Sequence, residues 1–511
     1  MKRTIAAIAG VAAAALALTA CSGGSDTSAP SEDGGAPVTQ ELKIGNFLDL
    51  TSWDTAVADI GFNGPYLSAV YDPLIALDGE GAPQPALATD WELSDDSLTV
   101  TLELRDDAVF SNGEKLDAAA VVANLEYLKD GAISREAYLS VDRFEAVDDD
   151  TVAIHLNERD DRLLYFMGLG RSYMAAPEAI AAGTLADAPV GSGPYTLSDA
   201  TVPGAEYHFD KVEGHWADAD FPFPKVIVYP ILDPSARNNA MEAGQTNVTF
   251  ADATTIEMAA QHGWNVVDKV AAWVGLRIND HTGDQLAPLG DVRVRQALNY
   301  AFDGEAILEN IASGSGVYTN QFFAAGFPGH DPALDGRYAH NIERAKELMA
   351  EAGYADGFDI TMPVAGPFLT WQPTVDQVFQ ELGIRVTWDE FQMPDYQANA
   401  PSYPMYIVSL AVDAEPVATI ARQLTVPQWY MPEPDISEFP DLQAQIDASL
   451  AAPRGDEQVA EIKKLNGMLT EQAWHVVWYQ SKNTFVSTSD IEVTPVTGMM
   501  FPTLRHIQPA G

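Results

Sequence analysis

Residues 291–302 read Asp-Val-Arg-Val-Arg-Gln-Ala-Leu-Asn-Tyr-Ala-Phe, and this stretch does most to decide the fold. Its apolar positions recur at helical spacing and form one stripe, made of Val294, Ala297, Leu298 and Ala301. Such a stripe is typical of a helix that lies against a buried core. Beyond about residue 270, helices of this kind alternate with apolar strands, which indicates an α/β fold.

The rest of the second half follows the same alternation. Helices are predicted from apolar spacing and from the glycines that end them, and strands from short apolar runs. The predicted elements are helices over residues 291–302, 341–352, 372–382, 440–450 and 455–470, buried strands at 384–388 and 405–410, and a strand pair at 476–479 and 484–486. We expect Arg293 and Arg295, on the first of these helices, to pair with nearby carboxylates rather than to contact a ligand.

The first half mixes strands and helices. Residues 98–104 alternate strictly between apolar and polar side chains, and a helix capped by Asp117 follows. Together they indicate a small α+β unit. The other predicted elements are strands at 42–47, 207–209 and 225–232, a strand entered from the turn at 190–195, and helices at 64–70 and between Asp233 and Gly244.

The composition limits the possible partners. The 511 residues include 74 acidic and 28 basic side chains, which gives a formal net charge of −46. This charge argues against nucleic-acid phosphates and anionic lipid head groups as partners. Cys21 is the only cysteine, so the rest of the chain has no disulfide framework, thiolate metal site or cysteine nucleophile.

The first forty residues predict export and a lipid anchor. A basic start precedes an alanine-rich apolar run that ends in Leu18-Thr19-Ala20-Cys21. We expect a signal peptide over residues 1–20 and a diacylglycerol thioether on Cys21, which would hold the protein to the outer face of the cytoplasmic membrane. Small and polar residues dominate 21–40, as in a flexible tether. The alternative is an ordinary signal peptide with a cysteine near its cleavage site by chance.

Several short motifs occur in the order that is characteristic of one protein family. They are Tyr71–Ile75, Pro85–Ala88 with Trp91 and Glu92, Leu102–Arg105, Phe110–Glu114, Asp117–Val122, Val190–Tyr195, Asp291–Leu298, Ala301–Asp303 and Ala345–Tyr354. In this order they resemble the extracellular solute-binding proteins of family 5, the peptide/nickel family that serves ABC importers. Taken singly, most of these residues only shape turns or helix cores. The resemblance spans nearly all of residues 42–488.

The resemblance implies a two-lobed α/β fold of the periplasmic-binding-protein type II class, with an extra α+β domain on the first lobe. The implied parts are domain I (residues 41–78, 190–270 and 481–511), domain II, which extends the first lobe (79–189), and domain III, the second lobe (271–480). The chain would cross between the lobes near residues 270 and 480. Ligand contacts on both sides of such a cleft drive hinge closure, and no chemistry on the ligand is needed.

The resemblance also implies where a ligand binds. The implied ligand-binding residues are Asp413, Ser409, Ala411, Asp59, Gly61 and Phe391. Asp413 would hold the ammonium group of an extended peptide, and the backbones of Ser409 and Ala411 would bond its main chain. The alternative for Asp413 is a helix N-cap or a solvated loop acid. The segment before Glu415 is one residue shorter than in many peptide binders and lacks their tryptophan.

We therefore predict a monomeric receptor that captures a small solute, first of all a di- or oligopeptide, and passes it to an ABC permease without a cofactor or metal. A nickel chelate or a short oligosaccharide is the alternative ligand, and Trp371, Trp429 and Tyr430 are the aromatic candidates for a cleft wall. His208 and His215 are expected to be structural. An enzyme has little support, because the sequence holds no H-E-x-x-H, G-x-S-x-G, S-x-x-K or Walker-type motif. A surface sensor or adhesin is a further alternative.

Overall fold

The computed structural model describes residues 40–58 and 61–511, and the structural statements below concern this part of the chain. The predicted signal peptide, Cys21 and the tether up to residue 39 lie outside the described residues, as does Asp59. Within the described residues, no helix combines the length and the apolarity that crossing a membrane requires.

The largest sheet combines strands from both halves of the chain. Its order is β16-β12-β17-β11-β1-β10-β9-β8, and β13 pairs with β17 as a branch. β1 is parallel to β10 and β11, and the other neighbours are antiparallel. The bounds are β1 Leu42–Asn46, β8 Tyr195–Leu197, β9 Tyr207–Lys211, β10 Lys225–Pro230, β11 Val248–Phe250, β12 Asn265–Ile278, β13 Gly316–Val317, β16 Met405–Ala411 and β17 Val476–Ser487.

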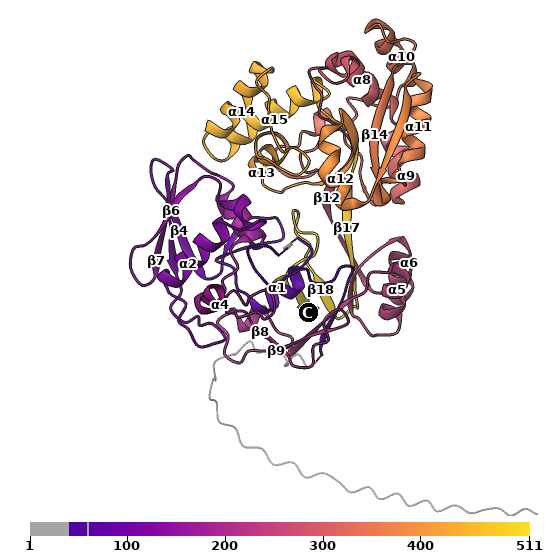
Figure 1. Ribbon diagram of the computed structural model, residues 1–511. Coiled ribbons are helices and arrows are strands. Elements are labelled where there is room, and N and C mark those ends of the chain that lie inside the picture. The colour runs from indigo at the N-terminus through magenta and orange to yellow at the C-terminus, as the bar shows by residue number, and fades with distance from the viewer. Residues whose placement is uncertain (1–39, 59–60) are drawn as a thin grey trace, which may run out of the picture. The chain divides into compact units, whose positions relative to one another are not determined.

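Two long strands, β12 and β17, lie side by side within this sheet (Figure 1). β17 corrects a prediction, because residues 476–487 form one continuous strand rather than a strand pair. Polar side chains interrupt its apolar pattern, but neighbouring loops satisfy them. Gln480 Nε2, for example, donates to the carbonyls of Gln321 and Phe323 at 2.9 and 2.7 Å. The predicted crossings near residues 270 and 480 fall within β12 and β17, and the division into three domains stays a prediction.

A separate four-stranded antiparallel sheet, in the order β4-β5-β7-β6, forms in the first half of the chain (Figure 1). Its elements are β4 Ala88–Leu93, β5 Thr99–Leu104, β6 Val141–Ala146, β7 Thr151–Leu156 and the helix α2 Ala118–Lys129, which contacts β6 and β7. Asp117 Oδ1 accepts a hydrogen bond from Ala120 N at 3.0 Å and caps α2, as predicted. Val121, Leu125 and Leu128 of α2 are buried.

The deciding stretch forms helix α8 (Val292–Ala301), and its predicted apolar stripe is buried. Arg293 pairs with Asp291 at 2.5 Å, as expected. Arg295 differs from the prediction, because its buried guanidinium donates to the backbone carbonyls of Leu289 and Gln472 instead of pairing with a carboxylate. Both arginines therefore hold α8 in place.

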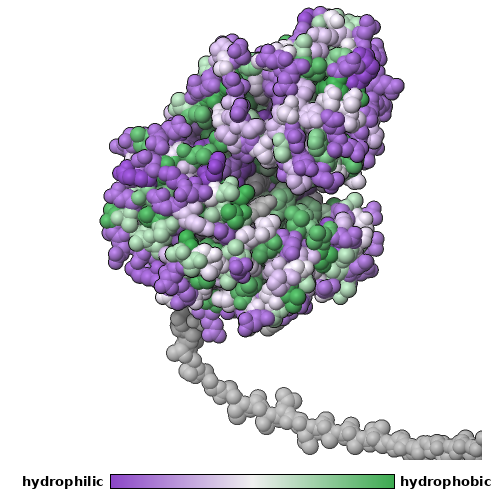
Figure 2. All heavy atoms as spheres, in the orientation of Figure 1, coloured by the Kyte–Doolittle hydropathy of each residue, from purple (hydrophilic) through white to green (hydrophobic). Residues whose placement is uncertain are grey.

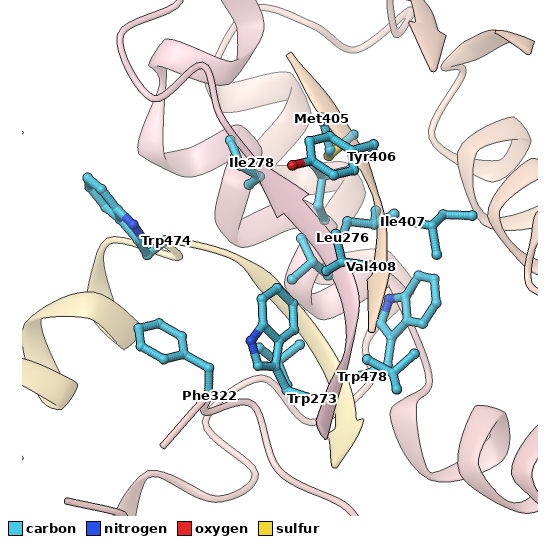
Figure 3. Close-up of a cluster of buried hydrophobic side chains, with 14 of the residues drawn as sticks. Trp273, Leu276, Ile278, Phe322, Met405, Tyr406, Ile407, Val408, Trp474 and Trp478 are labelled. Atoms are coloured by element: carbon cyan, nitrogen blue, oxygen red, sulfur yellow. The ribbon is translucent and has the colours of Figure 1, made fainter. Parts of the chain in front are cut away.

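A large hydrophobic core joins β12, β16 and β17. Figure 3 shows Trp273 and Leu276 of β12, Ile407 and Val408 of β16, and Trp478 of β17 around these strands.

A two-stranded parallel sheet, made of β14 (Asp359–Ala365) and β15 (Arg385–Phe391), lies beside this core. β15 was predicted to be buried, but Arg385, Thr387 and Glu390 are exposed, because Val386, Trp388 and Phe391 alone pack against the core.

The helices predicted at 64–70, 341–352, 372–382, 440–450 and 455–470 are confirmed within a residue or two. Besides α2 and α8, the α-helices of the described residues, these five included, are α1 Gly64–Val70, α3 Leu163–Phe166, α4 Pro177–Ala182, α5 Pro234–Glu242, α6 Ala253–His262, α7 Ala287–Gly290, α9 Gly304–Ala312, α10 Ile342–Glu351, α11 Gln372–Glu381, α12 Met393–Asn399, α13 Pro416–Ile420, α14 Pro440–Ala451 and α15 Asp456–Glu471. Short strands complete the described elements: β2 Ile75–Leu77, β3 Pro83–Pro85, β18 Ile491–Val493 and β19 Ile507–Pro509.

Candidate functional site

A cavity of about 800 Å³ lies between residues 132–171 and residues 368–432, and we call it the cleft cavity. A smaller cavity of about 160 Å³ adjoins it, because both are lined by Ile133, Arg171, Ala411 and Arg422. Figure 2 shows one face of the molecule, hollowed near its middle and hydrophilic over much of its remaining surface. A volume of this size suits a ligand of several residues or a compact small molecule.

Strand β16 supplies a free edge to the cleft cavity. It is the terminal strand of the main sheet, and its residues Ser409, Leu410 and Ala411 line the cavity. Val412 N donates to Ala271 O of β12 at 3.0 Å, so by the alternation of an antiparallel ladder the backbone groups of Ser409 and Ala411 point away from β12. An extended peptide can form hydrogen bonds with such outward-facing N–H and C=O groups and so add as a further strand at the edge of the sheet.

Four charged side chains form one cluster beside the two cavities: Glu136, Arg171 and Arg422 line the cleft cavity, and Asp413, which lines neither cavity, contacts Arg422. Arg422 donates through Nε and Nη2 to the two oxygens of Glu136, at 2.8 and 3.2 Å, and through Nη1 to Asp413 Oδ1 at 2.9 Å. Arg171 Nη2 donates to Glu136 Oε2 at 2.6 Å. Burial alone would raise the pKa of Glu136, but Arg422 and Arg171 hold that pKa well below its ordinary value. Two cations and two anions leave this cluster without net charge.

Asp413 keeps one oxygen free of protein partners. Its side chain is almost fully buried, and its Oδ1 accepts from Arg422 and from the Tyr165 hydroxyl, the latter at 3.3 Å. Its Oδ2 is buried and has no hydrogen-bond partner within the described residues. Burial raises the pKa of Asp413, although Arg422 lowers it. The helix-capping role considered for Asp413 belongs instead to Glu415, whose Oε1 accepts from Val417 N at 3.1 Å.

The other predicted site residues lie at different distances from the cavities. Gly61 lines the smaller cavity, and Trp429 and Tyr430 line the cleft cavity. Phe391 and Trp371 pack against the hydrophobic core and are not among the lining residues of either cavity. The ligand-binding roles of Ser409, Ala411, Gly61, Phe391 and Asp413 stay predictions, and Asp59 lies outside the described residues.

The sequence analysis missed Glu136, Arg171 and Arg422. Glu136 lies 286 residues from Arg422 along the chain, so no spacing pattern links them. Arg422 follows Asp413 by nine residues, and the π-helical segment Ala421–Thr425 after α13 places its guanidinium against Asp413. The one available sequence signal for Arg422 was its closeness to Asp413, because a buried carboxylate requires a charged partner.

His215 and His208, which were expected to be structural or surface residues, each lie beside a carboxylate. His215 Nε2 lies 3.0 Å from Asp72 Oδ2 in a buried pair, and His208 lies 3.4 Å from Glu206. Within the described residues, no group of three or more His, Cys, Asp or Glu side chains is arranged to hold a metal ion.

The arrangement suits non-covalent binding of an extended polar ligand. β16 offers backbone groups, Glu136 together with Arg171 and Arg422 offers both signs of charge, and Trp429 and Met393 form apolar wall. Backbone pairing fixes orientation, and buried charged groups recognise ionised ends.

Comparisons with known proteins concern the sequence and the fold of the chain. The sequence profile of the bacterial extracellular solute-binding proteins, family 5 (middle part), matches residues 82–430, more than half of the chain. A heme-binding protein A of Haemophilus influenzae is 26% identical over 449 residues, which cover 76% of this chain and 78% of that protein. A glutathione-binding protein of Salmonella paratyphi A is 28% identical over 329 residues, and the chain spans 62% of its length, less than two thirds. A periplasmic binding protein of Helicobacter pylori, associated with an ABC transporter and solved with the peptide STSA, superposes with a TM-score of 0.77 at 19% identity, covering 92% of this chain and 98% of that one.

Proposed function

The chain belongs to the bacterial extracellular solute-binding proteins of family 5, with their type II periplasmic-binding-protein fold, and we propose that it captures a di- or oligopeptide in the cleft cavity. Members of this family bind a solute and deliver it to the permease of an ABC transporter. The proposed ligand is released chemically unchanged, because binding and closure need no bond to be made or broken.

The observation that carries the peptide proposal is the pairing of a free strand edge with a free buried carboxylate oxygen. Ser409 and Ala411 of β16 present backbone groups to the cavity, and Asp413, two residues further along the chain, has an Oδ2 atom with no hydrogen-bond partner within the described residues. The main chain of a peptide can bond to the edge of β16, and its ammonium group can pair with the Asp413 carboxylate. The relative named for glutathione, which is a tripeptide, supports the same ligand class.

We further propose that closure brings domain II and domain III together around the ligand. Asp161, in the predicted domain II, accepts from Arg454 Nε at 2.6 Å and from Gln458 Nε2 at 2.8 Å, both in the predicted domain III. These contacts lie away from the cleft cavity, so they can stabilise a closed state without touching the ligand.

The ammonium role of Asp413 is tested with a free-amine dipeptide and its N-acetyl derivative. We expect Asp413→Ala and the closer match Asp413→Asn to weaken binding of the free-amine form by about tenfold or more, since a buried ammonium loses its charged partner. Isothermal calorimetry gives both affinities, circular dichroism checks folding, and Asp447→Asn, an exposed acid on α14, is the matched control. An unchanged ratio between the two peptides removes Asp413 from the site. Failure of the wild type to bind any peptide, with native mass spectrometry showing a nickel chelate or an oligosaccharide instead, overturns the peptide proposal.

We also propose that the protein is exported and lipid-anchored through Cys21, and that the tether lets the binding domain reach the permease. The Leu18–Cys21 box supports this proposal. Cys21→Ser should release the protein from the membrane fraction of its host, with Ser22→Ala as control. Unaltered membrane fractionation of Cys21→Ser would count against lipidation.

A further inference from the structure

A second cavity, of about 320 Å³, lies in the second half of the chain, and we call it the Arg277 cavity. Tyr430 and Pro432 line both this cavity and the cleft cavity, so one short segment separates them. Figure 3 labels Ile278 and Trp474, two further wall residues, at one end of the hydrophobic core. The proposed peptide binding does not use this cavity.

The base of the cavity carries a buried positive charge without a carboxylate. Arg277 of β12 is 3% exposed. Its Nε donates to Asn279 Oδ1 at 3.2 Å, its Nη1 lies 3.2 Å from His475 Nε2, and its guanidinium carbon lies 5.1 Å from the centre of the Tyr430 ring. No acidic side chain in the described part of the chain forms an ion pair with it. A buried guanidinium with only neutral partners is unusual, because a charge removed from water normally requires a counter-charge.

The surrounding titratable groups do not supply that counter-charge. Burial lowers the pKa of His281 to about 3 and that of His475 well below its ordinary value, so both are neutral. The carboxylate of Asp280 accepts hydrogen bonds from the backbone N–H groups of residues 283–286. Glu433 and Asp435 line the rim, where both are exposed to solvent.

A second polar group in the wall also has no partner. Gln423 is 1% exposed, and its Oε1 forms no hydrogen bond within the described residues. An amide can present either its carbonyl or its amino group, so Gln423 can pair with a hydroxyl or an amide of a ligand. The rest of the wall is apolar or aromatic, including Leu424, Ile436 and Trp474. Few polar groups in a mainly apolar wall are typical of small-molecule sites.

We propose that the Arg277 cavity is a second ligand site, which takes a small organic carboxylate with a compact apolar or aromatic body. The carboxylate pairs with Arg277, the body lies against Tyr430 and Trp474, and a polar substituent pairs with Gln423. The volume exceeds that of a bare anion, which favours an organic acid over chloride.

The test uses the full mature chain and 4-hydroxybenzoate, with 4-hydroxybenzamide as the uncharged match. Ligand-observed NMR and calorimetry should show binding of the acid, and binding of the amide weaker by about tenfold. Arg277→Gln and Arg277→Met should each lower the affinity for 4-hydroxybenzoate by a similar factor. Gln423→Leu, which leaves the charge in place, should weaken 4-hydroxybenzoate more than benzoate, and it serves as the second variant if an Arg277 substitution fails to fold.

Two controls assign the site. Arg293→Gln, an exposed arginine on α8, should leave the affinity unchanged, and Arg422→Gln should retain binding of the acid. Loss of binding in Arg422→Gln but not in Arg277→Gln would locate the acid in the cleft cavity and overturn the proposal. Equal binding of acid and amide, displacement by chloride alone, or no binding of acetate, benzoate or 4-hydroxybenzoate would also overturn it.

Discussion

At the cleft cavity the lining residues Arg171 and Arg422 are balanced by Glu136 and by Asp413, which lies outside the cavity wall, whereas in the Arg277 cavity a single guanidinium has only neutral partners. The two cavities lie on either side of the segment that carries Tyr430. In a balanced cluster the charges pair with one another even when no ligand is bound. A ligand therefore binds by pairing with an atom that has no partner within the described residues, such as Asp413 Oδ2. An unbalanced cavity lacks its counter-charge until a ligand supplies it.

The largest expected effect comes from removing one charge in each region. Glu136→Gln leaves Arg171 and Arg422 buried without their shared carboxylate, and we expect the free energy of unfolding to fall by about 3–5 kcal/mol. Arg277→Met removes a lone buried charge, and we expect the free energy of unfolding to change by no more than about 1 kcal/mol or to rise. Urea unfolding measures both, with Glu126→Gln, an exposed acid on α2, as control. A larger loss in Arg277→Met than in Glu136→Gln would reverse the comparison.

The next effect is a pH dependence of opposite sign in the two regions. Burial raises the pKa of Glu415, beside Asp413, from 4.5 to about 7, and lowers the pKa of His281 from 6.5 to about 3. The Glu415 contribution to stability is present below pH 4.5 and is lost as the pH rises to about 7. The His281 contribution is present above pH 6.5 and is lost as the pH falls towards 3.

Between pH 4.5 and 6.5 the two contributions oppose each other, so single variants should reveal them. Glu415→Gln should leave the free energy of unfolding rising with pH, by up to about 1.4 kcal/mol per unit relative to the wild type. His281→Asn should change the slope in the opposite direction. Urea unfolding across this range checks both variants, and identical slopes in wild type and variants would show that neither group titrates as described.

The elements of both regions could largely be predicted from sequence, because local patterns determine them. The stripe on α8, the Asp117 cap and strand β16 each follow from spacing or capping within a few residues. The sequence patterns failed where tertiary contacts satisfy polar groups, as for Gln480 within β17, or where only one face of a strand packs against the core, as for β15. Propensity does not contain that information.

The charged groups of both cavities could not be predicted, because they meet through the fold. Asp413 was identified from the family resemblance. Its partner Arg422 also pairs with Glu136, which lies 286 residues away along the chain, so this cluster could not be predicted. Arg277 lies in β12, a strand that the sequence analysis did not predict, and its lack of a carboxylate partner is visible only in three dimensions. A sequence shows which charges exist and does not show which of them are balanced.

The smallest expected effect separates the two cavities at the residue they share. The Tyr430 hydroxyl donates to the backbone carbonyl of Arg422 at 3.1 Å, and the guanidinium carbon of Arg277 lies 5.1 Å from the centre of the Tyr430 ring. Tyr430→Phe removes the hydroxyl and keeps the ring, so we expect peptide affinity to fall by about fivefold and 4-hydroxybenzoate affinity to stay unchanged. Tyr430→Leu removes the ring as well, so it should also lower the affinity for 4-hydroxybenzoate. Calorimetry with both probes measures these effects. If Tyr430→Phe weakened binding of both probes equally, the two cavities would act as one site, because the hydroxyl bonds to Arg422 and forms no bond with Arg277.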